Sequence, residues 1–216
     1  LLEACGPRLA AELPVFCAPQ QEEPVMRTLR RLKEQGLTHA LCGNLGALLM
    51  AREAGLEIIG DYGLNIINSP AARQAAELGC GALTLSFECE RGAAKNIASP
   101  VPLGVIAYGH LPLMLLRNCP GKTAAGCGDC TGINRITDRR GEDFPLQCER
   151  RRYTHLLNPR PLLLCDRLPE WDFCDFLTLR FTVESPAECD EVLKMYRTGA
   201  APAGQFTRGL YYRTLK

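Results

Sequence analysis

The fold class is decided by the stretch His39-Ala-Leu-Cys-Gly-Asn-Leu-Gly-Ala-Leu-Leu-Met-Ala-Arg-Glu-Ala-Gly-Leu-Glu-Ile-Ile59. Its first four residues are apolar enough for a buried strand, and residues 45–54 have the pattern of a helix that Gly55 ends. A second short strand is predicted at 56–59. A strand, a helix and a strand within about 20 residues are typical of parallel neighbours in an α/β sheet.

The same alternation continues on both sides of this stretch. Strands are predicted at 13–17, 82–86, 102–108, 161–165 and 176–181, and helices at 22–35, 70–78 and 185–196. Asn44 and Asn68 are candidate helix caps, and Ser185-Pro-Ala-Glu188 has the pattern of a capping box. About seven strands, one fewer than a full (β/α)8 barrel has, predict a single α/β domain over 1–216, either a parallel sheet or an incomplete barrel, with an irregular Cys-rich insertion at 118–160.

Composition narrows the class of protein. Apolar residues make up 46% of the 216 residues and charged residues 23%, with a net charge of +1, so no global field favours nucleic acid or a membrane surface. No apolar run reaches the roughly 18–20 residues of a membrane span. Several of the twelve cysteines lie in strand-like or helix-like runs, which indicates a reduced, cytoplasmic protein. The chain does not begin with Met, and we expect further domains of a longer parent protein.

Four cysteines form the strongest chemical motif, with the spacing C-x7-C-x2-C-x17-C: Cys119, Cys127, Cys130 and Cys148. The surrounding segment is rich in Gly and charge, so a bound metal is the simplest way to hold it in shape. An iron–sulfur cluster tolerates this irregular spacing, whereas structural zinc usually draws on a second C-x2-C or a pair of histidines. Zinc, or no metal at all, remains an alternative, and Cys165 and Cys189 are alternative fourth ligands.

Polar residues at the predicted strand ends are candidate site residues, because chemistry in parallel barrels gathers there. They are Asp61, Asn65, Glu88, His110, Asp166, Arg180 and Glu184. His110 precedes the cysteine segment and has a structural or a catalytic role. Arg180 lies in an apolar strand, so it either pairs with Asp166 or Glu184 or binds an anionic substrate.

Five short motifs together resemble the collagenase-like peptidases of unassigned catalytic type, family 32. They are Gly60-Asp-Tyr-Gly-Leu-Asn65, Leu111-Pro-Leu-Met114, Arg117-Asn-Cys-Pro120, Thr137-Asp-Arg-Arg-Gly-Glu-Asp-Phe-Pro145 and Gln205-Phe-Thr-Arg-Gly209. The resemblance covers residues from about 37 to 209 and implies the later portion of a TIM-barrel-like domain. The family's Cys-x4-Gly-x-Cys core is replaced here by Tyr108-Gly-His-Leu-Pro-Leu-Met114, which contains no cysteine.

The resemblance also implies a function. Relatives of this family are hydroxylation factors that modify tRNA or ribosomal RNA or act in oxygen-independent ubiquinone synthesis, and several carry a [4Fe–4S] cluster on four cysteines. Carried over to this chain, the ligands are the four clustered cysteines, the acceptor is RNA or a small aromatic molecule, and prephenate is the implied oxygen donor. A collagenase-like peptidase and a zinc-stabilised non-catalytic fragment are the alternatives.

Roles for the candidate residues follow from that hypothesis. We expect Arg117 and Arg180 to hold an anionic group, and His110 or Asp166 to carry protons. We also expect Asp61 and Arg180 to be catalytic together with His110 and Asp166. We expect Asn65, Glu88 and Glu184, with Arg117, to contact the substrate.

Overall fold

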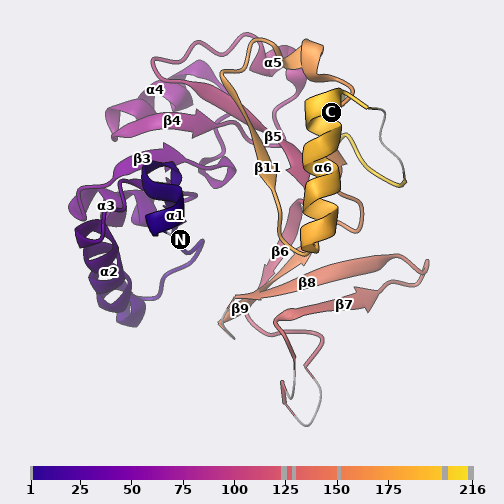
Figure 1. Ribbon diagram of the computed structural model, residues 1–216, viewed down its shortest axis with the longest axis horizontal. Coiled ribbons are helices and arrows are strands. Elements are labelled where there is room, and N and C mark those ends of the chain that lie inside the picture. The colour runs from indigo at the N-terminus through magenta and orange to yellow at the C-terminus, as the bar shows by residue number, and fades with distance from the viewer. Residues whose placement is uncertain (1, 123–125, 128–129, 150–151, 201–203, 214–216) are drawn as a thin grey trace. The chain divides into compact units, whose positions relative to one another are not determined.

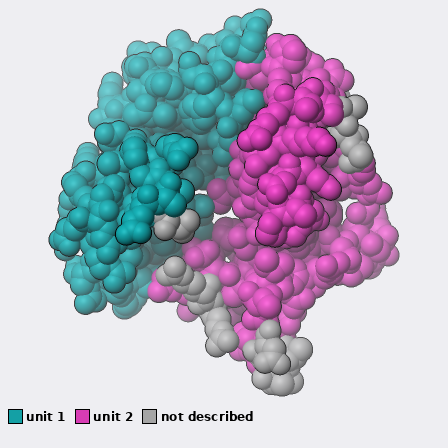
Figure 2. Space-filling model, viewed as in Figure 1, with its two compact units in different colours: residues 1–106, 172–178, 209–216 teal, residues 107–171, 179–208 magenta. Residues whose placement is uncertain are grey.

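The computed structural model describes residues 2–122, 126–127, 130–149, 152–200 and 204–213. The chain forms two compact units (Figure 2). Unit 1 contains residues 1–106, 172–178 and 209–216, and unit 2 contains residues 107–171 and 179–208. Each unit is described on its own below. Across the described residues, no helix combines the length and the apolar character that crossing a bilayer requires.

Unit 1 is built on a parallel sheet whose strands follow in the order β1-β2-β3-β4-β5 and which curls like part of a barrel (Figure 1). The strands are β1 (Ala10–Glu12), β2 (His39–Cys42), β3 (Glu57–Gly60), β4 (Cys80–Thr84) and β5 (Leu103–Gly109), the last of which runs on into unit 2. The helices are α1 (Leu2–Cys5), α2 (Pro19–Glu34), α3 (Leu45–Glu53), α4 (Ser69–Glu77) and α5 (Arg91–Ala94), with the 3-10 turns η1 (Gly6–Arg8) and η2 (Tyr62–Leu64). The observed fold is mixed α/β with a curled parallel sheet, and it is compatible with the predicted incomplete barrel.

Local signals place the helices of unit 1 where the sequence predicts them. The Asn44 side chain accepts a hydrogen bond from Ala47 N at 2.8 Å, and Asn68 accepts one from Ala71 N at 2.9 Å, so both asparagines are N-caps. Gly55, directly after α3, has a φ of 69°, a left-handed conformation that glycine adopts at little cost. The predicted helix over 45–54 is thereby confirmed to within one residue.

The first strand lies earlier than predicted. The prediction was 13–17, but β1 covers Ala10–Glu12 and pairs with β2 in parallel. One further ladder bond, from Leu13 N to Leu41 O at 3.0 Å, follows the strand. Pro14 has no N–H, so the ladder cannot continue through it, and the carbonyls of Pro14 and Val15 accept from the Asn44 side chain instead.

The core of unit 1 includes the fully buried side chains of Leu48, Leu83 and Tyr211. Tyr211 returns from the far end of the chain, and its hydroxyl donates to Ile106 O at 2.9 Å. The Tyr211 carbonyl in turn accepts from Arg91 N at 2.8 Å. A residue separated from β5 by most of unit 2 therefore completes the packing of unit 1.

Unit 2 contains the end of β5, the end of β11 (Phe176–Arg180), β10 (Leu162–Leu163), the 3-10 turn η3 (Leu168–Trp171) and α6 (Pro186–Thr198). Tyr108, Leu163, Cys165 and Val192 form its buried apolar cluster. The capping box is confirmed, since the Ser185 side chain accepts from Glu188 N. β10 runs antiparallel to β5, whereas the predicted alternation implied a parallel strand.

The segment predicted to be irregular, 118–160, contains three strands of a second sheet. Its strand order is β6-β9-β8-β7, all antiparallel: β6 (Pro112–Leu116), β7 (Ile133–Thr137), β8 (Asp143–Glu149) and β9 (Tyr153–Leu157). The β7–β8 hairpin turns at Asp138, whose carboxylate accepts from Arg140 N and Glu142 N, and at Gly141, which has a φ of 80°. An antiparallel meander thus takes the place of a crossover helix between β5 and β10, and it accounts for the direction of β10.

Candidate functional site

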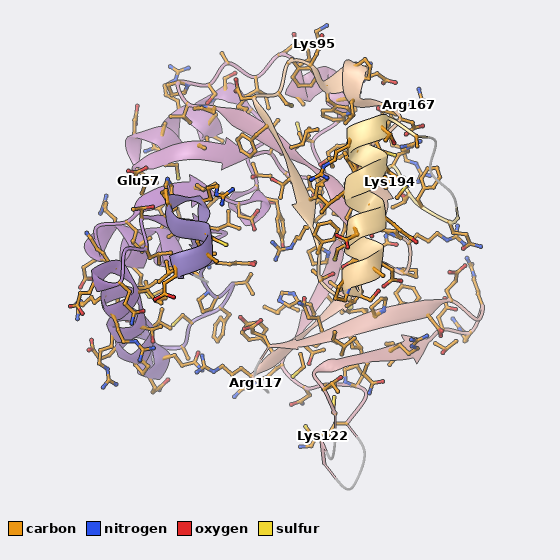
Figure 3. The ribbon with its side chains drawn as sticks, in the orientation of Figure 1. Glu57, Lys95, Arg117, Lys122, Arg167 and Lys194 are labelled. Atoms are coloured by element: carbon orange, nitrogen blue, oxygen red, sulfur yellow. The ribbon has the colours of Figure 1, made fainter. Side chains whose placement is uncertain are left out.

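The four clustered cysteines are carried by the meander of unit 2. Cys119 follows β6, Cys127 and Cys130 lie between β6 and β7, and Cys148 lies within β8. Arg117, labelled in Figure 3 at the end of β6, is exposed beside Cys119 in the sequence. None of the twelve cysteines forms a disulfide bond.

Gly132 connects two of these cysteines through its backbone. Gly132 N donates to the Cys130 sulfur at 3.4 Å, and Gly132 O accepts from Cys148 N at 2.7 Å. Cys130 N also donates to Cys127 O at 3.0 Å, which connects the backbones of these two cysteines. A backbone N–H directed at a cysteine sulfur favours the thiolate, the form that binds metals.

The thiols are not gathered into a finished site. Within the part of the chain that the structure describes, no group of three or more His, Cys, Asp or Glu side chains is placed to hold a metal ion. The donors nevertheless suit a thiolate-ligated centre in kind, since Cys127, Cys130 and Cys148 share contacts with one short backbone stretch. Cys119 would complete a set of four.

His110 and Glu184 lie together elsewhere in unit 2. His110 Nδ1 is 2.7 Å from Asn158 O, and its Nε2 is 3.9 Å from Glu184 Oε1. Both side chains are largely buried, with exposed fractions of 13% for His110 and 5% for Glu184. The sequence predicted both residues, although it gave them separate roles as a proton carrier and a substrate contact.

The second oxygen of Glu184 is held by its own loop. Glu184 Oε2 accepts from Thr182 N at 2.6 Å and from Val183 N at 3.0 Å. The hydroxyl of Tyr108 lies beside this carboxylate, and burial together with the Glu184 charge raises the Tyr108 pKa. Burial, with Glu184 next in effect, also raises the pKa of the Cys189 thiol.

Asp166, predicted as a proton carrier, is engaged in an ion pair. Arg208 Nη1 and Nη2 each donate to one oxygen of Asp166, at 2.7 Å. These bonds hold the Asp166 pKa below its ordinary value. Arg208 also donates to Leu163 O, and its guanidinium lies over the Phe206 ring, 4.6 Å from the centroid. Sequence reasoning missed Arg208 as a site residue, although it lies within the motif 205–209.

Arg180 approaches β5 at a glycine. A side chain at Gly109 would collide with the carbonyl oxygen and Cβ of Arg180, so only glycine allows β11 and β5 to come this close. Both Asp166 oxygens accept from Arg208, which makes Arg208 the partner of that carboxylate. The predicted anion-binding role of Arg180 stays a prediction.

The remaining predicted residues, Asp61, Asn65 and Glu88, belong to unit 1, where Asn65 and Glu88 contact Ser86. Asn65 has a left-handed φ of 53°, and its side chain accepts from the Ser86 hydroxyl at 3.4 Å. Ser86 Oγ also accepts from Glu88 N at 3.3 Å, which brings Glu88 to the same place. Asp61 is buried at the end of β3. Asp61, Asn65 and Glu88 thus follow β3 and β4, as the parallel strand order predicts.

Two buried thiols of unit 1, those of Cys42 and Cys80, lie near Asp61. Burial, with smaller contributions from Cys80 and Asp61, raises the pKa of the Cys42 thiol to about 12. Burial alone raises the pKa of Cys80 to about 11. Both thiols therefore stay protonated at neutral pH and act as apolar packing groups.

Comparison with models of known protein families, with curated proteins and with solved structures found no match to this chain.

Proposed function

We propose that this chain is an iron–sulfur-dependent hydroxylation enzyme of the family 32 type, acting on an RNA base or a small aromatic acceptor. The observation that carries the proposal is the backbone of Gly132, which contacts the Cys130 sulfur on one side and the Cys148 amide on the other. The sequence motifs quoted above support the same assignment.

Cys119, Cys127, Cys130 and Cys148 would hold a [4Fe–4S] cluster, whose chemistry is to accept and deliver single electrons. The chain's own contribution is to orient the thiols. The hydrogen bond from Cys130 N to Cys127 O would hold two ligands together, and the β8 ladder, in which Cys148 pairs with Thr154, would fix a third. The N–H of Gly132 would stabilise negative charge on the Cys130 sulfur.

The acceptor and the oxygen donor form the second half of the proposal. Prephenate, an anionic molecule, is the proposed oxygen donor, and the exposed guanidinium of Arg117 lies two residues from Cys119 to meet an anionic group. His110 supplies an imidazole in the same unit for proton transfer.

Purification under anaerobic conditions, followed by analysis of iron, sulfide and zinc, tests the cofactor. We expect about four irons per chain and a broad visible absorption that air bleaches. Cys119→Ser, Cys127→Ser, Cys130→Ser and Cys148→Ser should each lower the iron content, and Cys17→Ser, which changes a thiol of unit 1, should not. A protein without iron would overturn the proposal, and stoichiometric zinc would favour the zinc-stabilised alternative.

Activity is tested separately. The iron-loaded protein with prephenate and a two-electron acceptor should convert an R–H group of tRNA, ribosomal RNA or a small phenol into R–OH. Prephenate would supply the oxygen and leave as phenylpyruvate and CO2, and the electron acceptor would take up the two electrons. Mass spectrometry of the RNA or phenol detects the added oxygen atom. Hydrolysis of gelatin or casein, lost in a single-residue variant, would instead establish the peptidase alternative.

A further inference from the structure

Two buried polar atoms in the loop before α6 stand out, because neither has a hydrogen-bond partner among the described residues. They are Thr182 Oγ1 and Glu184 Oε1. Leaving a polar atom buried without a partner costs about 1–3 kcal/mol, and more for a charged group. Two such atoms two residues apart indicate that something absent from the chain satisfies them.

Glu184 is held so that only one of its oxygens is available. Its Oε2 accepts from two backbone N–H groups, of Thr182 and Val183, while Oε1 faces His110 Nε2 at 3.9 Å. That distance exceeds the range of a hydrogen bond, which ends near 3.5 Å. The free oxygen is therefore presented to the imidazole without being bonded to it.

His110 presents an acceptor from the other side. Its Nδ1 lies 2.7 Å from Asn158 O, and a carbonyl can only accept, so Nδ1 carries the hydrogen. In the neutral imidazole Nε2 is then an acceptor. With a neutral imidazole, Nε2 and Glu184 Oε1 are both acceptors, and the protein donor nearby is the Tyr108 hydroxyl beside the Glu184 carboxylate, which leaves Oε1 without a geometric hydrogen bond.

The groups around this pair are acidic or weakly polar. Tyr108 lies beside Glu184. The Cys189 thiol interacts electrostatically with Glu184, Asp190 and Glu188. The exposed Glu188 carboxylate, although bonded to Ser185, also interacts electrostatically with His110. A positively charged donor is the ligand that such surroundings favour.

We propose that His110, Thr182 and Glu184 bind a protonated nitrogen, either an ammonium ion or the primary ammonium end of a larger molecule. A nitrogen about 2.8 Å from both Nε2 and Oε1 fits, because those two atoms are only 3.9 Å apart. The N–H bonds of such a group can meet Glu184, His110 and the Thr182 hydroxyl, and its charge offsets that of the buried carboxylate. Metal ions such as Na⁺ or K⁺ offer no N–H donor to the imidazole. This inference concerns a different set of residues from the cysteines and does not depend on the presence of iron.

Proton NMR of the histidine rings tests the proposal, because the chain has only three histidines. The His110 signal is assigned by its loss in H110Q. Titration with methylammonium chloride should shift that signal saturably with a midpoint of about 5–10 mM or weaker, the range that so small a ligand can reach. The signals of His39 and His155 should not move with it. Sodium chloride at equal ionic strength and tetramethylammonium, which has no N–H, should leave the His110 signal in place.

Variants make the test specific. E184Q should weaken the response at least about tenfold, because it removes the charge that receives the ligand. E188Q is the matched control, since it removes an exposed carboxylate of the same neighbourhood, and the response should persist. Thr182→Val, which keeps the shape but removes the hydroxyl, should weaken binding as well and serves if E184Q fails to fold.

The proposal is overturned by a shift of equal size with sodium or tetramethylammonium, by no saturable shift with either ammonium or methylammonium, or by an unchanged response in both E184Q and Thr182→Val. A response to ammonium and not to methylammonium would assign the site to the free ion. Responses to both would assign it to the amine end of a larger ligand.

Discussion

Arg208 grips Asp166 with two parallel hydrogen bonds of 2.7 Å, although 42 residues of chain separate them. The same guanidinium donates to Leu163 O and covers the Phe206 ring. Three hydrogen bonds from this side chain attach the segment after α6 to Leu163 in β10 and to Asp166 just beyond that strand. This pair supports the structure of unit 2 and occupies a carboxylate that the sequence suggested for catalysis.

Replacing Arg208 should therefore lower stability more than charge alone explains. R208K keeps the charge but cannot form two parallel bonds or lie flat on Phe206, so we expect a loss of about 1 kcal/mol in the free energy of unfolding. Urea denaturation measures it. R197K, a change of the same chemistry in the last turn of α6, is the control and should be neutral, whereas equal losses in both variants would contradict a specific role for the pair.

The same pair predicts how stability depends on pH. Arg208 lowers the pKa of folded Asp166 below its unfolded value of about 3.9. The contribution of Asp166 is therefore complete above about pH 5 and is lost as the pH falls through the lower, folded value. The wild type should lose more stability than D166N between about pH 5 and pH 3, measured as urea midpoints. Parallel curves for the two proteins would show that the pair contributes nothing.

Tyr196 on α6 connects β5 with the residue that directly follows β10. Its hydroxyl donates to Ala107 O and accepts from Leu164 N at 2.9 Å. Tyr196→Phe leaves both backbone groups without this partner, so we expect a loss of about 1–2 kcal/mol by thermal or urea unfolding. If Tyr196→Phe unfolded at the same denaturant concentration as the wild type, these two hydrogen bonds would contribute nothing to stability.

Gly109 cannot carry a side chain. Its φ is 142°, and a Cβ there would overlap Arg180 O. G109A should destabilise the protein by about 2 kcal/mol or more, since backbone strain and a collision with main-chain atoms add together. G81A, in β4 and with no close neighbour, is the control for adding a methyl group. If both variants unfolded at the same denaturant concentration, β11 would not approach β5 as described.

Local sequence signals predicted the part of the fold that they control. Asn44 and Gly55 mark a helix by capping chemistry that acts within a few residues, so the unit from β2 to β3 could be predicted closely. Polar residues after β3 and β4 come together for the same reason, because parallel strands end at one edge. These predictions need no knowledge of distant contacts.

The meander and the pairing of Asp166 depend on contacts that no local pattern indicates. Strand β7, at the edge of its sheet, has the sequence Ile-Asn-Arg-Ile-Thr, which does not alternate between apolar and polar residues as a half-buried strand does. Its Ile133 side chain is 49% exposed. Asp166 pairs with Arg208 and not with Arg180 because the tertiary fold brings Arg208 to it from 42 residues away in the sequence. Composition and spacing could propose a carboxylate at a strand end, and only the folded chain shows which cation it binds.

Tyr211 has a consequence for the order in which the protein can be made. Strands β1 to β5 are synthesised before most of unit 2. Tyr211, whose buried hydroxyl donates to Ile106 O, is added 105 residues after Ile106. Until then the first half of the nascent chain lacks one of its largest core side chains. Strands β1 to β5 therefore cannot reach their final packing until Tyr211 has been made.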